Sequence, residues 1–183
     1  MKAQVRGWTL VEVIVVLVIL AVLIAIELPS FLGVIQQTRL AVATHELMSM
    51  IALARSEAIS RNSRTVLCVA TGHTGCALDG GWHQGWLLFE DINSNGALDV
   101  TEQIIRYQSA SHPQLVIKGN LPVARYISFL GNGRSHLLSG AMQAGTISIC
   151  HRASIPVEGR AIVINVVGRP RVKNWSPSTS SCE

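Results

Sequence analysis

The chain has 183 residues, of which 49% are hydrophobic and only 5% aromatic, and its formal net charge is +4. This length leaves room for one membrane helix and one domain of about 120 residues, with a core built mostly from Val, Ile, Leu and Ala. The sequence has no Ser/His/Asp arrangement, nucleophile elbow, phosphate loop or pair of carboxylates in apolar surroundings. These absences argue against an enzyme and give no reason to expect a cofactor.

An apolar run from Trp8 to Ile26 opens the chain and is interrupted by one carboxylate, Glu12. Its length is close to the roughly 20 residues that a helix needs to cross a bilayer. Lys2 and Arg6 precede the run, and the next cation is Arg39, so the positive-inside rule predicts a cytoplasmic N-terminus and an exported remainder.

Two other interpretations of this run remain. A secretory signal would have a shorter apolar region with a cleavage site after it, whereas the candidate cut here, at Gly7, lies before the run. A simple single-pass anchor would have no use for Glu12, because a carboxylate inside a membrane helix normally needs a partner.

Residues 30–62 follow with the periodicity of an amphipathic helix, which predicts a continuation of the first helix with its apolar stripe packed on a sheet. From residue 63 onward short β-rich runs alternate with turn residues. The expected strands are 66–70, 86–90, 103–107, 114–118, 126–130, 146–150 and 161–167, with an irregular tail over 175–181. One long helix followed by strands predicts an α+β fold with mainly antiparallel sheets.

Four cysteines, Cys68, Cys76, Cys150 and Cys182, lie on the exported side of the predicted helix, where disulfides persist. Three pairings are possible, and the spacing favours Cys68 with Cys76, which leaves Cys150 for Cys182. The alternative for the first pair is a zinc site in which His73 and His83 supply two further ligands.

The segment from Asp91 to Glu102 matches the twelve-residue calcium loop of an EF-hand, with Asp91, Asn93, Asn95, Asp99 and Glu102 as the ligand positions and Gly96 at the turn. An EF-hand loop joins two helices, whereas this segment lies between predicted strands. We therefore favour a hairpin in which Asp and Asn side chains cap the turn and Gly96 takes a positive φ, with calcium as the minority hypothesis.

Charge is unevenly distributed along the chain. Residues 65–105 carry five acids and no Lys or Arg, whereas residues 106–173 carry nine cations and one acid, Glu158. The densest cationic stretch is Gly168-Arg169-Pro170-Arg171-Val172-Lys173, where alternation would place Arg169, Arg171 and Lys173 on one side. Such a row could follow a nucleic-acid backbone, or it could be a solvated edge that resists aggregation.

The motif Gly7-Trp8-Thr9-Leu10-Val11-Glu12 resembles the prepilin motif of type IV pilins and type II secretion pseudopilins, with Trp8 where the family usually has Phe. Residues 81–105, 129–133 and 145–150 resemble strands of the FimT/GspH family of minor pseudopilins. Gly168-Arg169-Pro170-Arg171 resembles the GRxR motif of its FimT branch, whose members bind DNA during natural transformation.

This resemblance implies a type IV pilin-like fold with four parts: a leader (1–7), a transmembrane and assembly helix (8–29), its amphipathic continuation (30–62) and a β-rich globular domain (63–183). A prepilin peptidase would cut after Gly7 and methylate Trp8, and Glu12 would pair with the N-terminus of a neighbouring pilin subunit. The chain would span the inner membrane, with a periplasmic globular domain, before it enters a pilus at the cell surface.

The resemblance also implies binding of double-stranded DNA through Gly168, Arg169 and Arg171, extended by Lys173, with Arg134 and Arg152 as weaker candidates. The alternative is a structural minor pseudopilin that helps to start a type II secretion pseudopilus or a type IV pilus without binding DNA.

Overall fold

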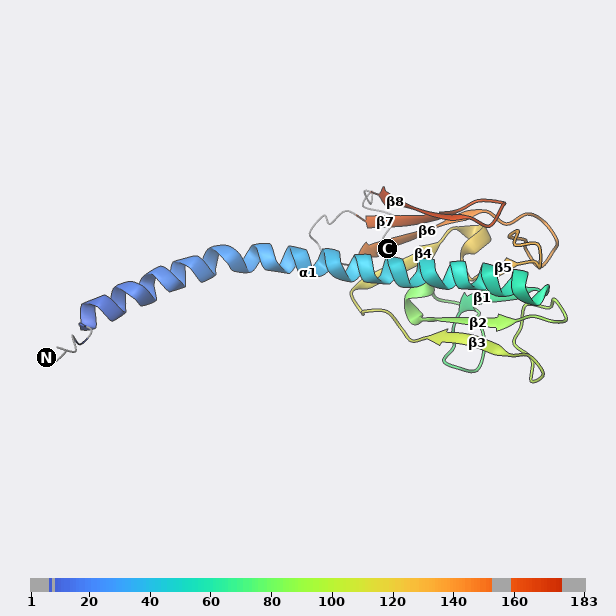
Figure 1. The fold of residues 1–183 in the computed structure, drawn as a ribbon, viewed down its shortest axis with the longest axis horizontal. Coiled ribbons are helices and arrows are strands. Elements are labelled where there is room, and N and C mark those ends of the chain that lie inside the picture. The colour runs from blue at the N-terminus through green and yellow to red at the C-terminus, as the bar shows by residue number, and fades with distance from the viewer. Residues whose placement is uncertain (1–6, 8, 153–158, 176–183) are drawn as a thin grey trace, which may run out of the picture. The chain divides into compact units, whose positions relative to one another are not determined.

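The computed structural model describes residue 7 and residues 9–152 and 159–175; of residues 25–30, 32 and 175 only the backbone is described. The chain divides into two compact units, residues 1–37 and residues 38–183. The described elements are α1 (Leu10–Arg61), β1 (Thr65–Val69), η1 (Trp82–Gln84), β2 (Trp86–Glu90), β3 (Ile104–Gln108), β4 (Leu115–Gly119), η2 (Leu121–Val123), β5 (Tyr126–Phe129), β6 (Gly145–His151), β7 (Gly159–Ile164) and β8 (Pro170–Trp175) (Figure 1).

In the first unit, helix α1 begins just after Thr9, whose Oγ1 accepts a hydrogen bond of 3.3 Å from the backbone N–H of Glu12. This contact is a helix N-cap, and Glu12 in the first turn is favourably placed at the positive end of the helix. Side chains 9–24 are all exposed. Within the described residues, no helix is both long enough and apolar enough to cross a membrane.

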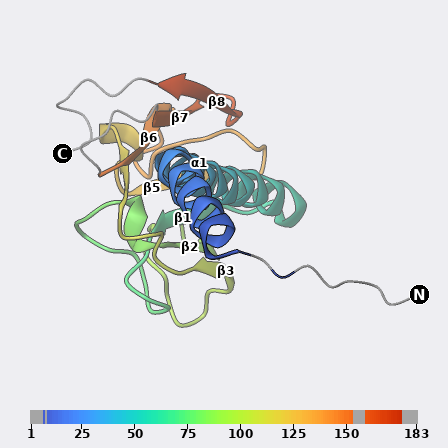
Figure 2. The ribbon, with the colours of Figure 1, turned by 90° about the vertical axis from the view of Figure 1, so that its left-hand side faces the viewer.

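The second unit contains two four-stranded antiparallel sheets, with strand orders β3-β2-β1-β5 and β4-β6-β7-β8. We call them the N-terminal sheet and the C-terminal sheet. Strand β3, at one edge of the N-terminal sheet, and strand β8, at one edge of the C-terminal sheet, lie at opposite sides of this unit in both ribbon views (Figures 1 and 2).

Helix α1 supplies an apolar stripe to the core of the second unit, with residues such as Leu40, Leu47 and Ile51 at helical spacing. Both sheets contribute to the same cluster, for example through Leu67 and Ile162. All buried hydrophobic side chains of the described residues lie between positions 40 and 164. Residues 38–183 therefore contain a complete core of their own, and a fragment of residues 34–183 keeps it together with one extra helical turn.

The α+β expectation is confirmed, and most expected strands lie within one residue of the observed bounds. Helix α1 ends at Arg61, and Asn62 takes the left-handed conformation (φ 50°) common after a helix C-terminus. The predicted strand 161–167 is wrong at its end, because β7 stops at Ile164 and a turn follows. Strand β8 is not among the predicted strands, and it contains Trp175, for which the sequence predicts irregular structure; residues 176–183 lie outside the described residues.

Candidate nucleic-acid interface

A tight turn between β7 and β8 presents Arg169. The side chain of Asn165 caps it, since Asn165 Oδ1 accepts a hydrogen bond of 3.0 Å from the backbone N–H of Arg169. The Gly168 N–H donates to Asn165 O at 2.8 Å, and Gly168 has φ 77°. Because this conformation favours glycine, the first residue of the GRPR sequence sets the geometry of the turn.

Gly168 also packs against a second loop. A Cβ at this position would lie 2.5 Å from Gly133 O and 3.0 Å from the Phe129 ring. Ser135 Oγ lies 3.1 Å from Asn165 O, within hydrogen-bond distance. The loop that carries Arg134 is therefore in direct contact with the turn that carries Arg169.

Strand register shows which way the cations of β8 project. Arg171 pairs with Val163 and Lys173 with Ala161, whereas Val172 pairs with Ile162, a core residue. Directly opposite residues share a face of a sheet, so Arg171 and Lys173 project from the outer face, away from the core. The expectation of a common side holds for these two cations, while Arg169 lies in the turn before the strand begins.

The candidate cations are exposed and form no ion pair with the acids that the structure describes. Arg169, Arg171, Lys173, Arg134 and Arg152 are all exposed. The ion pairs found among the described residues both involve Arg61, with Glu57 and Glu90 at 2.8 Å. A phosphate would therefore not compete with a carboxylate of the described residues for any of the five candidates.

Arg152 is separate from the others. It follows β6 at the end opposite Gly145, and Gly145 pairs with Ile164 beside the turn. Seven residues of extended chain span roughly 23 Å, so Arg152 does not reach the turn that holds Arg169.

Lys118 also lies on the outer face of the C-terminal sheet, and no sequence pattern indicates that it lies there. Lys118 of β4 is exposed, and it pairs with Ser148, which pairs with Ala161, which pairs with Lys173. Lys118 is 55 positions from Lys173 in a region of scattered cations. Only the pairing of four strands could bring it to the same face.

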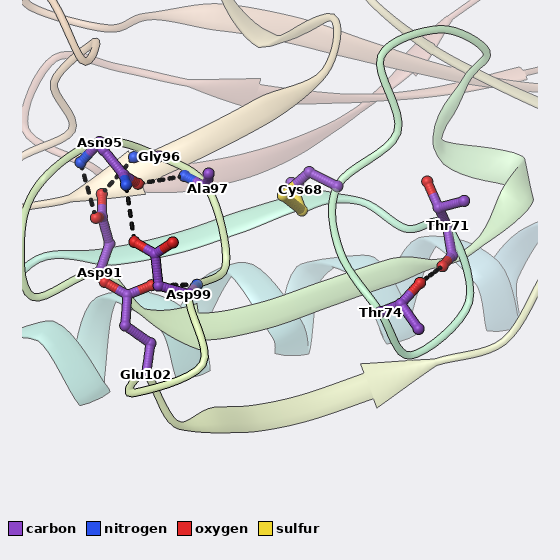
Figure 3. Close-up of a disulfide and its surroundings, with 10 residues drawn as sticks. Cys68, Thr71, Thr74, Asp91, Asn95, Gly96, Ala97, Asp99 and Glu102 are labelled. Carbon is purple, nitrogen blue, oxygen red and sulfur yellow. Dashed lines mark hydrogen bonds between the residues drawn. A yellow bond between two sulfur atoms is a disulfide. The ribbon is translucent and has the colours of Figure 1, made fainter.

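The Asp91–Glu102 segment forms the β2–β3 connection, with Gly96 at φ 75°. Asp91 is fully buried and accepts hydrogen bonds from the backbone N–H groups of Asn95 (3.0 Å) and Gly96 (3.1 Å). Glu102 accepts from Ile92 (2.9 Å) and Asp99 (3.1 Å). Figure 3 shows these side chains turned into the loop.

These contacts fit the hairpin interpretation, since the polar side chains stabilise the loop's own backbone. Asn93 and Asn95 donate to Asp99 Oδ2 at 2.7 and 2.8 Å. Burial raises the pKa of Asp91, with the two backbone N–H groups acting in the opposite direction. In the described part of the chain, no three His, Cys, Asp or Glu side chains are arranged to hold a metal ion, and calcium binding stays the minority prediction.

The predicted Cys68–Cys76 disulfide is present, with an S–S distance of 2.03 Å (Figure 3). The zinc alternative is wrong because both sulfurs are bonded to each other. The His73 ring instead packs against Tyr107, with ring centroids 3.8 Å apart and the ring planes tilted by 41°. Cys150 is also disulfide-bonded. Its expected partner Cys182 lies outside the described residues, as does Trp8 of the leader motif.

An N-terminal helix packed on two antiparallel sheets defines the type IV pilin-like fold, in the class of minor pilins and pseudopilins. Residues 43–168 match the family described as type II transport protein GspH, and residues 2–26 match the prokaryotic N-terminal methylation motif. The chain belongs to the GspH family. Its members are structural proteins rather than enzymes. The matched region ends at Gly168, immediately before Arg169.

Solved structures agree on the fold. The type IV minor pilin FimU of Pseudomonas aeruginosa has a TM-score of 0.59 and 21% identity, covering 81% of this chain and 98% of that one. The minor pseudopilin EpsH from the type 2 secretion system of Vibrio cholerae has a TM-score of 0.51 and 13% identity, covering 73% and 95%.

A relative in sequence is the pilin-like protein PilA1 of Thermus thermophilus, 38% identical over 100 residues, which are 54% of this chain and 56% of PilA1. The chain therefore spans about half the length of this relative.

Proposed function

We propose that this minor pilin binds double-stranded DNA without sequence preference, through the β7–β8 turn and strand β8, during DNA uptake in natural transformation. We assign it to the FimT branch on the sequence Gly168-Arg169-Pro170-Arg171. In this proposal a prepilin peptidase cuts after Gly7 and methylates Trp8, and Glu12 contacts a neighbouring subunit. The chain moves from the inner membrane into a pilus beside major and minor pilins.

The observation that carries the proposal is the group of exposed cations at Arg169, Arg171 and Lys173, none of which has an ion pair among the described residues. Arginine offers a planar fork that matches phosphate oxygens, and contacts to phosphate do not read sequence. The turn adds to this, because its hydrogen bonds fix the backbone of Arg169 and less backbone freedom is lost on binding.

The direct test replaces both arginines in the 34–183 fragment, as Arg169→Ala with Arg171→Ala, and measures duplex binding by gel shift across a salt series. We expect a large loss of affinity and a log-log salt slope shallower by about 1.8, since each phosphate contact contributes about −0.9. The melting temperature should not change, because both side chains are exposed.

The matched control is Arg106→Ala with Arg125→Ala, which removes the same charge from exposed sites outside the C-terminal sheet. If both double variants lose the same affinity, binding follows net charge and the assigned site is wrong. If neither loses affinity, DNA binding by this unit is rejected.

The second candidate function is assembly alone, favoured by the fold shared with the minor pilin FimU and the minor pseudopilin EpsH. In cells, the Arg169/Arg171 double variant separates the two functions. Loss of DNA uptake with intact pili supports DNA binding, whereas loss of pili supports an assembly role for the basic strand.

A further inference from the structure

The outer face of the C-terminal sheet carries cations at both edges. A register row crosses all four strands, from β4 through β6 and β7 to β8, and consists of Lys118, Ser148, Ala161 and Lys173. The adjacent row, Ile117, Ile149, Arg160 and Asn174, begins with two core residues. Since neighbouring residues of a strand project to opposite faces, the first row lies on the outer face.

The two lysines are separated by a fixed distance. Strands β4 and β8 are three inter-strand spacings apart, which is about 14 Å at about 4.8 Å each. Between them the row presents Ser148 and Ala161, and the next outer row presents Thr146 and Val163. Ala161 is buried and the other three are half-buried, so the exposed cationic side chains of Lys118 and Lys173 extend beyond them on either side.

Among the residues that the structure describes, the outer face carries no acid. The described outer-face positions of the sheet are 116 and 118, 146, 148 and 150, 159, 161 and 163, and 171 and 173, and none is Asp or Glu. Lys118 is exposed and has no ion pair among the described residues. The face therefore attracts a polyanion across its width and not only along β8.

We propose that duplex DNA lies across this outer face, with Lys118 contacting the phosphates of one strand and Arg171 and Lys173 those of the other. The inference rests on the proposed function and adds a preference for double-stranded over single-stranded DNA. The major groove is about 12 Å wide, so cations about 14 Å apart can engage the backbones on its two sides. A single strand that follows β8 reaches only one side of the face.

The test compares duplex and single-stranded binding of the Lys118→Ala fragment (residues 34–183) by fluorescence anisotropy across salt, with a 30-base-pair duplex and oligo(dT) as probes. We expect weaker duplex binding, a salt slope shallower by about 0.9 and unchanged oligo(dT) binding. Arg171→Ala should weaken both. Lys118→Arg should restore duplex binding, and Arg125→Ala is the control for loss of one exposed charge outside the sheet.

Each outcome decides between the two proposals. If Lys118→Ala leaves duplex binding intact while the Arg169/Arg171 variant weakens it, the two-sided arrangement is wrong and the proposed function stands. If Lys118→Ala weakens duplex and single-stranded binding equally, the strand preference is wrong. If no variant changes binding, the proposed function fails as well.

Discussion

The β2–β3 connection and the β7–β8 turn use the same local chemistry for opposite purposes. Both contain a glycine with positive φ, Gly96 and Gly168, and both have a side chain that accepts hydrogen bonds from the turn's own backbone, Asp91 and Asn165. In the β2–β3 connection, the carboxylates of Asp91 and Glu102 point inward and accept hydrogen bonds from backbone N–H groups of the loop. In the second, a neutral amide does the capping, so the charged side chain of Arg169 is left exposed.

The comparison distinguishes charged side chains that stabilise the fold, such as Asp91, from charged side chains that are available to a ligand, such as Arg169. Sequence alone marked both segments as candidate sites, one for calcium and one for phosphate. Their hydrogen bonds differ, because the Asp91 carboxylate accepts two backbone N–H groups and stabilises its own loop, whereas Arg169 only has its backbone N–H bonded. A cation without a partner among the described residues is available to an anionic ligand.

The largest effect should come from Asp91→Ala, which removes a buried acceptor and leaves the Gly96 N–H without its partner. We expect a loss of about 2 to 3 kcal/mol in the free energy of unfolding, measured by urea denaturation. Asp79→Ala, at an exposed position, should cost almost nothing. DNA affinity of the folded Asp91→Ala fragment should be unchanged, and a weaker affinity would mean that the two regions are not independent.

Gly168→Ala should lower the free energy of unfolding by less than Asp91→Ala does. Its matched control is Gly140→Ala. Both glycines have positive φ, but a Cβ at Gly140 meets nothing within 4 Å, whereas a Cβ at Gly168 meets Gly133 O. The left-handed conformation alone costs roughly 1 kcal/mol. Gly168→Ala should therefore lose more stability than Gly140→Ala and should also weaken DNA binding. Equal effects of the two variants would show that the loop contact does not position Arg169.

The smallest effect concerns pH and His151, a buried residue of β6 in the same sheet as β8. Burial lowers the pKa of its imidazole below the ordinary value of 6.5, and Arg39 of α1 and His112 of the β3–β4 connection lower it further. At a pH between the pKa of His151 in the folded chain and its pKa in the unfolded chain, the unfolded chain binds more protons. The free energy of unfolding therefore falls as the pH decreases below about 6.5.

His151→Leu should flatten this part of the profile, measured as melting temperature from pH 7.5 to pH 5. His45→Leu, at an exposed position of α1, is the control and should leave the slope unchanged. An unchanged slope in His151→Leu would exclude His151 as its source.

Local signals in the sequence predicted much of the fold. Helical spacing of residues such as Leu47 and Ile51 gave the amphipathic half of α1, and the glycine and asparagine pairs gave the turns. The sequence pattern places the end of β7 too late because Val166 and Val167 extend its β-branched run, whereas a turn capped by Asn165 follows Ile164 in the structure. Strand β8 was missed because Pro170 and three cations are untypical of a strand. An edge strand tolerates both, since one side of its backbone has no partner to bond.

The sequence by itself determined the family, the Cys68–Cys76 preference and the concentration of cations after residue 105, because each of these is carried by neighbouring or regularly spaced residues. Only the tertiary structure decided which charges are free and which faces they share. Asp91 accepts hydrogen bonds from backbone groups of the loop that folds around it, and Lys118 shares a sheet face with Lys173 across two intervening strands. Both outcomes depend on strand register and backbone direction, which link residues far apart in the chain and leave no local pattern in the sequence.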